Sequence, residues 1–188
     1  MTVSLVSYTL PADPKTITGW VIERSSTMSI EGSSNISAFT CDLKEYLSQD
    51  TLYYSKDEKA KKLLFLNSVL NIDIVRFDCH NKFITADFRK ILKADKIPQL
   101  KVRFISLDDL VIGGIVKGRV EIEIAGQTRQ MDISYTVQQY GNAQVQLIGS
   151  KDMDFSDFQL VPPKKLGGLI RINEEIKVNF HLHLRRLT

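Results

Sequence analysis

Three histidines, His80, His181 and His183, are the residues best suited to metal or acid–base chemistry. His181 and His183 are two positions apart, so on a β-strand their rings point to the same face and offer two nitrogens to a metal ion. A closed metal site needs about four ligands, and no third or fourth donor stands at a matching spacing. The simpler interpretation places both rings on the polar face of a strand, and we predict no metal and no cofactor.

The two cysteines, Cys41 and Cys79, form the second group capable of chemistry. Cys41 is in phase with Phe39 and Leu43, and Cys79 is in phase with Phe77, so both thiols are expected among buried side chains. Neighbouring strands would bring the pair within reach of a disulfide. Two buried free thiols are the alternative, and the compartment decides, because an oxidising one favours the bridge.

Paired carboxylates offer no convincing acid–base site. Asp108 and Asp109, like Glu174 and Glu175, are adjacent in the sequence, so on a strand their side chains point to opposite faces. Glycine-rich phosphate loops, paired zinc-protease histidines and the serine elbow of hydrolases are all missing from the sequence. We therefore expect a protein that is not an enzyme.

Charge and hydropathy exclude further classes. The chain has 188 residues, 43% of them hydrophobic, with 25 Lys and Arg against 22 Asp and Glu, for a net charge of +3. The basic clusters at 59–62, 164–165 and 185–186 are short, which is typical of a solvated surface and leads us to expect no nucleic-acid partner. A weak attraction to anionic lipid surfaces is the alternative for these clusters. No apolar run approaches the roughly 18 residues that span a bilayer, so no stable membrane insertion is expected.

The elements that position these residues are mostly strands, because apolar residues recur with a period of two. Val120, Ile122 and Ile124 alternate with polar residues, as do Ile176 and every second residue up to Leu184. Further strands are predicted at 19–23, 27–31, 35–43, 62–67, 69–79, 100–104, 131–140 and 143–149. Glycine-containing turns at 31–35, 112–114, 125–127 and 140–142 favour hairpins, and hence an antiparallel sandwich or barrel. The length of the C-terminal strand favours the barrel.

One helix interrupts the pattern. In residues 81–94, Ile84, Phe88, Ile91 and Leu92 share one helical face, which predicts a short helix covering one end of the barrel. Asn81 or Thr85 could cap its start. Residues 42–50 are expected to add a turn of helix, and residues 54–62 to form an exposed charged loop. We predict an N-terminal extension over residues 1–18 and a single barrel domain over residues 19–188.

The order of segments resembles the YceI-like family, whose members have lipocalin-like barrels associated with binding polyisoprenoid lipids. The matching segments are residues 20–30, 70–78, 91–98, 102–106, 116–122, 153–165 and 176–184. The resemblance implies an all-β fold, an antiparallel eight-stranded lipocalin-like barrel with one short helix over an end. It also implies a periplasmic or secreted protein, although residues 1–11 lack the basic start and long apolar core of a secretory signal.

The function implied by the resemblance is binding, sequestration or transport of a polyisoprenoid or other long-chain lipid inside the barrel. An eight-stranded barrel is just wide enough to hold one small ligand or to be filled by side chains. The apolar candidates to line it are Phe39, Ile72, Ile74, Phe104, Ile122, Ile133, Tyr135, Val145, Phe180 and Leu182. The alternative is a non-catalytic scaffold with a solid core that binds a protein or glycan through its loops. A strand edge could also support a homodimer.

Overall fold

A computed structural model describes residues 16–140, 144–165 and 169–187, which form one antiparallel sheet, a ten-residue α-helix and two short 3₁₀ helices. The strands are β1 (Ile17–Ile22), β2 (Thr27–Ser34), β3 (Ala38–Leu43), β4 (Thr51–Asp57), β5 (Lys62–Leu66), β6 (Val69–Asp73), β7 (Phe77–Asp78), β8 (Gln99–Asp108), β9 (Ile115–Ile124), β10 (Gln127–Tyr140), β11 (Gln144–Asp154), β12 (Lys164–Lys165) and β13 (Ile170–Arg186). The helices are η1 (Ile74–Arg76), α1 (Lys82–Ile91) and η2 (Phe155–Phe158).

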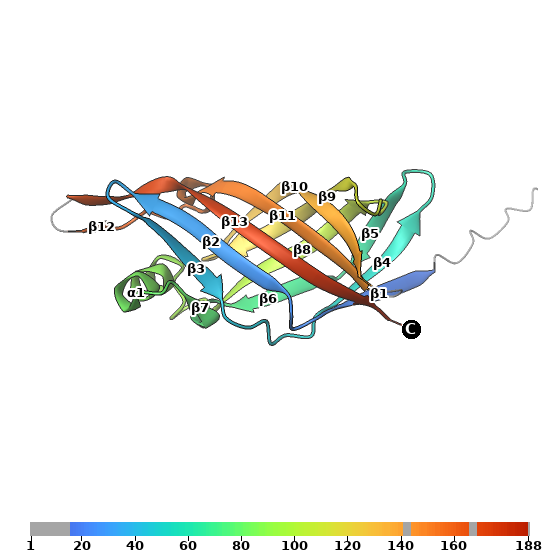
Figure 1. Ribbon diagram of the computed structural model, residues 1–188, viewed down its shortest axis with the longest axis horizontal. Coiled ribbons are helices and arrows are strands. Elements are labelled where there is room, and N and C mark those ends of the chain that lie inside the picture. Colours follow the sequence, from blue (N-terminus) through green and yellow to red (C-terminus); the bar gives the residue numbers. More distant parts are fainter. Residues whose placement is uncertain (1–15, 141–143, 166–168, 188) are drawn as a thin grey trace, which may run out of the picture.

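Eight of the strands close into a ring. Their order is β1-β4-β5-β8-β9-β10-β11-β13, and β13 returns to β1 through the pairs Trp20–Arg186 and Ile22–Leu184. Every pairing in the ring is antiparallel. The eight-stranded antiparallel barrel with a short helix at one end, expected from the sequence, is confirmed (Figure 1).

Two long strands change partners along their length, which divides the barrel into two ends. The 17-residue strand β13 pairs with β2 up to His181 and with β1 from Leu184. Similarly, β8 pairs with β6 over Gln99–Arg103 and with β5 over Ser106–Asp108. We call the part completed by β1, β4 and β5 the ring end, and the part built from β2, β3, β6, β7 and α1 the helix end; they lie at opposite ends of the long axis (Figure 1).

Strand alternation matches the sequence pattern because one face meets the core and the other meets water. Val120, Ile122 and Ile124 of β9 are buried, and the residues between them point outward. Outward Glu121 pairs with Arg103 of β8 at 3.2 Å. The turn at 125–127 is also as predicted, with Gly126 at a φ of +83°, a conformation that glycine adopts without strain.

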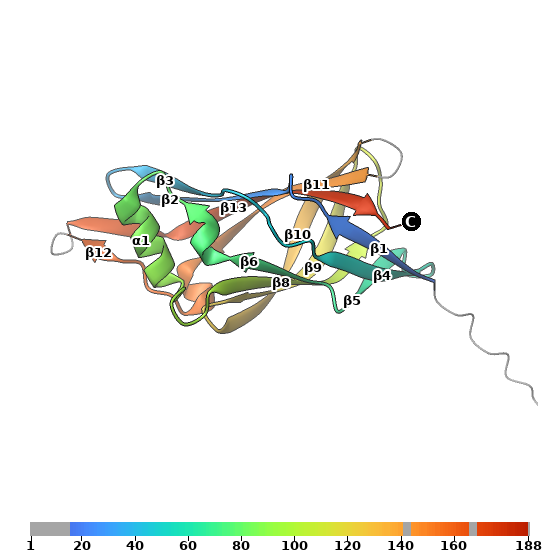
Figure 2. The same ribbon diagram turned by 90° about the horizontal axis from the view of Figure 1, so that it is seen from below.

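The helix α1 begins where the sequence predicted. The Asn81 side chain accepts hydrogen bonds from the backbone N–H groups of Phe83 and Ile84 at 2.9 and 3.2 Å, so Asn81 is the cap. Thr85 is instead buried, and its hydroxyl accepts a bond from the Cys79 N–H. Figure 2 shows the helix crossing the end of the barrel. In the ranges described, no helix is long and apolar enough to cross a membrane.

The expectation of a helical turn at 42–50 is wrong. Residues 42 and 43 belong to β3, and residues 44–50 run in irregular chain to β4. Tyr46 is buried there, and its hydroxyl donates to the Asp50 carboxylate, which also accepts from the Asn71 N–H of β6. Burial, and next the hydrogen bond to Asp50, raise the pKa of the Tyr46 hydroxyl. These tertiary contacts replace the local bonds that a helix would have made.

The expectation of a charged loop at 54–62 is also wrong. Residues up to Asp57 belong to β4 and Lys62 begins β5, so only a tight turn lies between them. The Asp57 carboxylate accepts bonds from the N–H groups of residues 59 and 60, which fixes the turn. The charged residues of this hairpin, which lies at the ring end, obscure the alternation of apolar and polar residues that indicates a strand. The predicted turn at 31–35 is likewise displaced, because β2 continues to Ser34. The predicted N-terminal extension lies almost wholly outside the described residues, and β1 begins at Ile17.

Candidate functional site

Two apolar cavities lie along the inside of the helix end. The larger, which we call the rim cavity, has a volume of about 190 Å³ and lies beneath α1. The smaller, the interior cavity, has a volume of about 70 Å³ and lies deeper in the barrel. Strands β2 and β13 each contribute residues to both cavities, so the two are arranged in series along the barrel.

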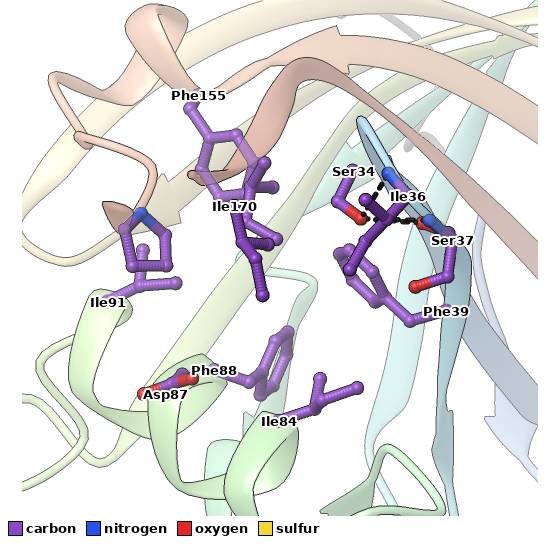
Figure 3. A pocket seen from close by; sticks show the side chains of 12 residues that line it. Ser34, Ile36, Ser37, Phe39, Ile84, Asp87, Phe88, Ile91, Phe155 and Ile170 are labelled. Atoms are coloured by element: carbon purple, nitrogen blue, oxygen red, sulfur yellow. Dashed lines mark hydrogen bonds between the residues drawn. The ribbon is translucent and has the colours of Figure 1, made fainter. Parts of the chain in front are cut away.

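The rim cavity is formed between the helix and the open ends of strands. Ile84 and Phe88 of α1 face Phe39 of β3, and Phe155 and Ile170 lie on the other side (Figure 3). Its full lining is Ser34, Ile36, Ser37, Phe39, Ile84, Asp87, Phe88, Ile91, Phe155, Pro163, Ile170 and Ile172. The Ser34 hydroxyl is already engaged, because it accepts from the N–H groups of Ile36 and Ser37 and donates to the Ser37 carbonyl. The surface offered to a ligand is therefore almost wholly apolar.

The interior cavity is lined by side chains of seven strands, β2, β6, β8, β9, β10, β11 and β13. Its lining is Met28, Ile30, Leu70, Leu100, Val102, Phe104, Ile122, Ile124, Ile133, Tyr135, Lys151, Met153, Val178, Phe180 and Leu182. Tyr135 packs on Phe180 with ring centroids 5.2 Å apart, and burial raises the pKa of its hydroxyl. Gly149 makes room for Phe180, since a Cβ at that glycine would lie 2.7 Å from the ring.

The ring end is filled by aromatic side chains. Trp20 packs on Tyr54 with ring centroids 4.5 Å apart, Tyr54 on Phe65 at 6.0 Å, and Phe65 on Phe104 at 5.4 Å. Leu52, with no exposed surface, lies in the same part of the core. Because Phe104 also lines the interior cavity, this aromatic cluster forms the closed bottom of the space that begins under α1.

Covalent and polar contacts hold α1 over the rim cavity. A disulfide joins Cys41 of β3 to Cys79, which lies between β7 and α1. Phe88 packs on Phe77 with centroids 5.3 Å apart, and the Arg89 guanidinium donates to the Val75 carbonyl at 2.7 Å. The disulfide continues a strand pairing between β3 and β7 that extends over only two residue pairs. The helix is thus attached to β3, β7 and η1 on one side of the opening.

The predicted lining residues fall into three groups. Phe39 lines the rim cavity. Six line the interior cavity, namely Phe104, Ile122, Ile133, Tyr135, Phe180 and Leu182. Ile72 and Ile74 are buried in β6 and η1 away from both linings, and Val145 of β11 is half-buried outside them.

Sequence reasoning did not assign the helix to the site. Ile84, Phe88 and Ile91 were expected to cover the barrel end, and they form the wall of the rim cavity itself. The sequence did contain a signal for this role, because the three residues share one apolar face of the helix. It did not show what that face packs against. Ile170 and Ile172 gave no such signal, because only the pairing of β13 with β2 brings them to the opening.

The histidines lie on the outside of the barrel. The His181 and His183 rings are 4.3 Å apart, and Gln146 of β11 contacts both, with its Oε1 3.0 Å from His181 Nε2. Burial, and next the neighbouring His183, lower the pKa of His181. His80 pairs with the Asp42 carboxylate at 2.6 Å. Among the described residues, no group of three or more His, Cys, Asp and Glu side chains is placed to hold a metal ion.

Comparisons with known proteins show the fold. No family profile and no curated protein sequence matches the chain. A polyisoprenoid-binding domain from Saccharophagus degradans, described as implicated in plant cell wall breakdown, matches with a TM-score of 0.63 and 13% identity, over 89% of this chain and 98% of its own. BcnA of Burkholderia cenocepacia matches with a TM-score of 0.57 and 17% identity, over 84% and 95%.

The YceI protein of Campylobacter jejuni matches over all of this chain and 94% of its own, with a TM-score of 0.54 and 11% identity. At these identities the likeness concerns the fold. The resemblance to YceI-like proteins expected from the sequence is therefore confirmed in the path of the chain.

Proposed function

We propose that this protein binds a long apolar ligand, a polyisoprenoid or a related lipid, inside its barrel and sequesters or transports it without covalent chemistry. The observation that carries the proposal is the pair of apolar cavities in series beneath α1. Eleven residues of β13, from Ile172 to Leu182, run past both cavities, a distance of about 33 Å at ~3.3 Å per strand residue. The fold shared with a polyisoprenoid-binding domain supports the same ligand class.

The chemistry of the lining favours an apolar chain. Among the described lining residues only Asp87 and Lys151 are charged. Each buried methylene of a ligand gains about 0.8 kcal/mol from leaving water. Among the described residues that line the interior cavity, only Tyr135 and Lys151 have side chains able to donate a conventional hydrogen bond, so we expect shape and length to select the ligand.

Binding of a long chain requires the interior cavity to widen. A dry apolar cavity of about 150 Å³ holds a benzene molecule, so the rim cavity accommodates the end of a chain, whereas the interior cavity of about 70 Å³ is too small. Met28 and Met153 line the interior cavity. Their unbranched side chains change rotamer easily, so we expect them to move first.

We also propose a periplasmic or secreted location. The disulfide between Cys41 and Cys79 supports it, because such bonds persist in oxidising compartments and are rare in the reducing cytosol. The measurement is alkylation of the two cysteines in the protein isolated from its native compartment. Modification of both thiols would contradict the proposal.

The test is native mass spectrometry after gentle extraction, which we expect to show a co-purifying hydrophobic ligand. Ile91→Trp places a larger ring in the rim cavity and should remove most of the bound ligand. The matched control is Ala86→Trp, an exposed position on the same helix outside the rim cavity, which should retain it.

An empty barrel in the unmodified protein, together with specific capture of a protein or glycan, would favour the alternative of a scaffold. Equal ligand retention by the two tryptophan variants would show that the ligand does not use the rim cavity.

A further inference from the structure

The helix end exposes large apolar side chains around the rim cavity. They are Ile36 in the turn after β2, Phe83 on α1, Val161 after η2 and Leu169 before β13, with 67%, 65%, 79% and 75% of their surface exposed. Single exposed apolar residues are ordinary, but a group at one place marks an interaction surface. The elements that carry these four residues gather at the same end of the molecule in both views (Figures 1 and 2). We call the four residues the rim patch.

Hydrogen bonds hold two members of the rim patch beside each other. The Asn35 side-chain amide donates to the Leu169 carbonyl at 2.9 Å, and its carbonyl accepts from the Arg171 N–H at 2.9 Å. The turn that carries Ile36 is thereby fixed to the start of β13. Ile36 also lines the rim cavity, as does Ile170, the residue after Leu169, so the rim patch borders the opening.

Positive charge accompanies the rim patch. Residues 82–96, which include α1, contain five Lys and Arg and two Asp. The sequence from 158 to 173 contains three Lys and Arg and no acidic residue. Each of these two segments has a net charge of +3, as large as that of the whole chain, and Glu174 and Glu175 follow the second one.

The turn between β8 and β9 differs from the rim patch in the charge of its neighbours. Val111 in this turn and Ile115 at the start of β9 are 58% and 74% exposed, at the ring end. Its flanking charges are Asp108 and Asp109, whose carboxylates pair with Lys62 and Lys56 of the neighbouring hairpin. This turn combines exposed apolar residues with acidic neighbours and lies far from α1 along the barrel (Figure 1).

We propose that the helix end docks on the surface of an anionic lipid bilayer. The rim patch enters the boundary between headgroups and acyl chains, the surrounding lysines and arginines attract the anionic headgroups, and the opening of the rim cavity faces the membrane. The inference rests on the proposed function, because it names the membrane as the place where the ligand enters and leaves the barrel. An apolar ligand then passes between bilayer and barrel without crossing water.

Sedimentation with vesicles tests the docking. We expect the protein to bind phosphatidylcholine vesicles that contain about one third phosphatidylglycerol, to bind pure phosphatidylcholine vesicles less, and to release from the anionic ones as salt rises. Val161→Ser with Leu169→Ser should weaken partitioning at least roughly tenfold, since two exposed side chains lose their place in the bilayer. Neither residue lines a cavity, so ligand retention should be unchanged.

The matched control is Val111→Ser with Ile115→Ser, which removes the same kind of surface at the ring end and should bind vesicles as the unmodified protein does. Lys90→Gln with Lys93→Gln should weaken binding to the anionic vesicles and leave the weak binding to phosphatidylcholine unchanged. All six positions are exposed, and circular dichroism checks that each variant is folded.

Absence of vesicle binding, or equal losses in the two serine pairs, would overturn the docking. Self-association through Val161 and Leu169 in place of vesicle binding would also overturn it and assign the surface to a second copy of the chain. Co-purified ligand without vesicle binding leaves the proposed function standing and rejects the docking. Vesicle binding by a protein that never carries ligand would reject the proposed function instead.

Discussion

The two ends of this barrel are closed by different kinds of contact. At the ring end, backbone pairing continues without a break through β1 and β4 to β5, and aromatic rings around Trp20 fill the enclosed space. At the helix end, β3 pairs with the two-residue strand β7, and a helix and a disulfide complete the wall. The cavity of about 190 Å³ lies where closure depends on side chains.

The difference shows where this fold is able to open. Separating two strands of the ring would leave several backbone N–H and C=O groups without partners, each at a cost comparable to a lost hydrogen bond. Moving α1 disturbs a few side-chain contacts and keeps the internal hydrogen bonds of the helix. We therefore expect the ring end to set global stability and the helix end to control access to the cavities.

The largest effect is expected at the ring end. Trp20→Ala removes a ring that is 4% exposed and packs on Tyr54, so it should lower the free energy of unfolding by about 3–5 kcal/mol in chemical denaturation. The control is Tyr53→Ala on the outer face of β4, where 46% of the side chain is exposed, and its effect should be much smaller. Comparable losses from both variants would contradict the central role of the aromatic cluster.

The disulfide should contribute next, and mainly at the helix end. Replacing Cys41 and Cys79 together with alanine should cost about 2–4 kcal/mol, since the bond closes a loop with a sequence separation of 38. Hydrogen exchange should accelerate on α1 and β3 and stay slow on β9 and β10. Uniform loss of protection over the whole barrel would show that the two ends unfold as one unit and would break the comparison.

The helix cap should have a smaller and local effect. Asn81→Ala leaves the N–H groups of Phe83 and Ile84 without their side-chain acceptor and should cost about 1 kcal/mol. Lys82→Ala, one residue further and exposed, is the control and should change stability little. Ligand should dissociate faster from the Asn81 variant, measured by native mass spectrometry over time, and an unchanged rate would argue against control of access by α1.

The smallest effect concerns the junction between the two ends, where β13 changes partner. Burial and the neighbouring His183 lower the pKa of His181 below its ordinary value of 6.5. The unfolded chain therefore binds a proton more readily, and the stabilising contribution is complete above that ordinary value and is lost as pH falls through the lowered one.

Unfolding titrations near pH 7.5 and near pH 5 should show a small loss of stability that His181→Gln reduces. An identical pH dependence in the two proteins would show that other groups are responsible.

Some features of the fold and of the cavities were predictable from the sequence and others were not. The alternation in β9 and β13 and the cap at Asn81 were predictable, because they depend on periodicity and on local hydrogen bonds. The strand at 62–67 was predictable too and is β5, whereas β4 was not, since its outward charges resemble those of a loop and only pairing with β1 and β5 makes it a strand. Seven of the ten predicted lining residues reach a cavity, whereas Ile72 and Ile74 pack elsewhere in the core.

By itself the sequence determined the strand-rich class, the antiparallel pairing of strands and the helix with one apolar face. These features depend on the spacing of apolar residues and on turn residues, which act over a few neighbouring positions. Only the tertiary structure decided which apolar residues fill space and which surround it. That distinction depends on which strands β13 and β8 pair with at each part of their length, and on the position of α1 over Phe39 and Ile172. Contacts between distant segments create a cavity, and no local pattern records its volume.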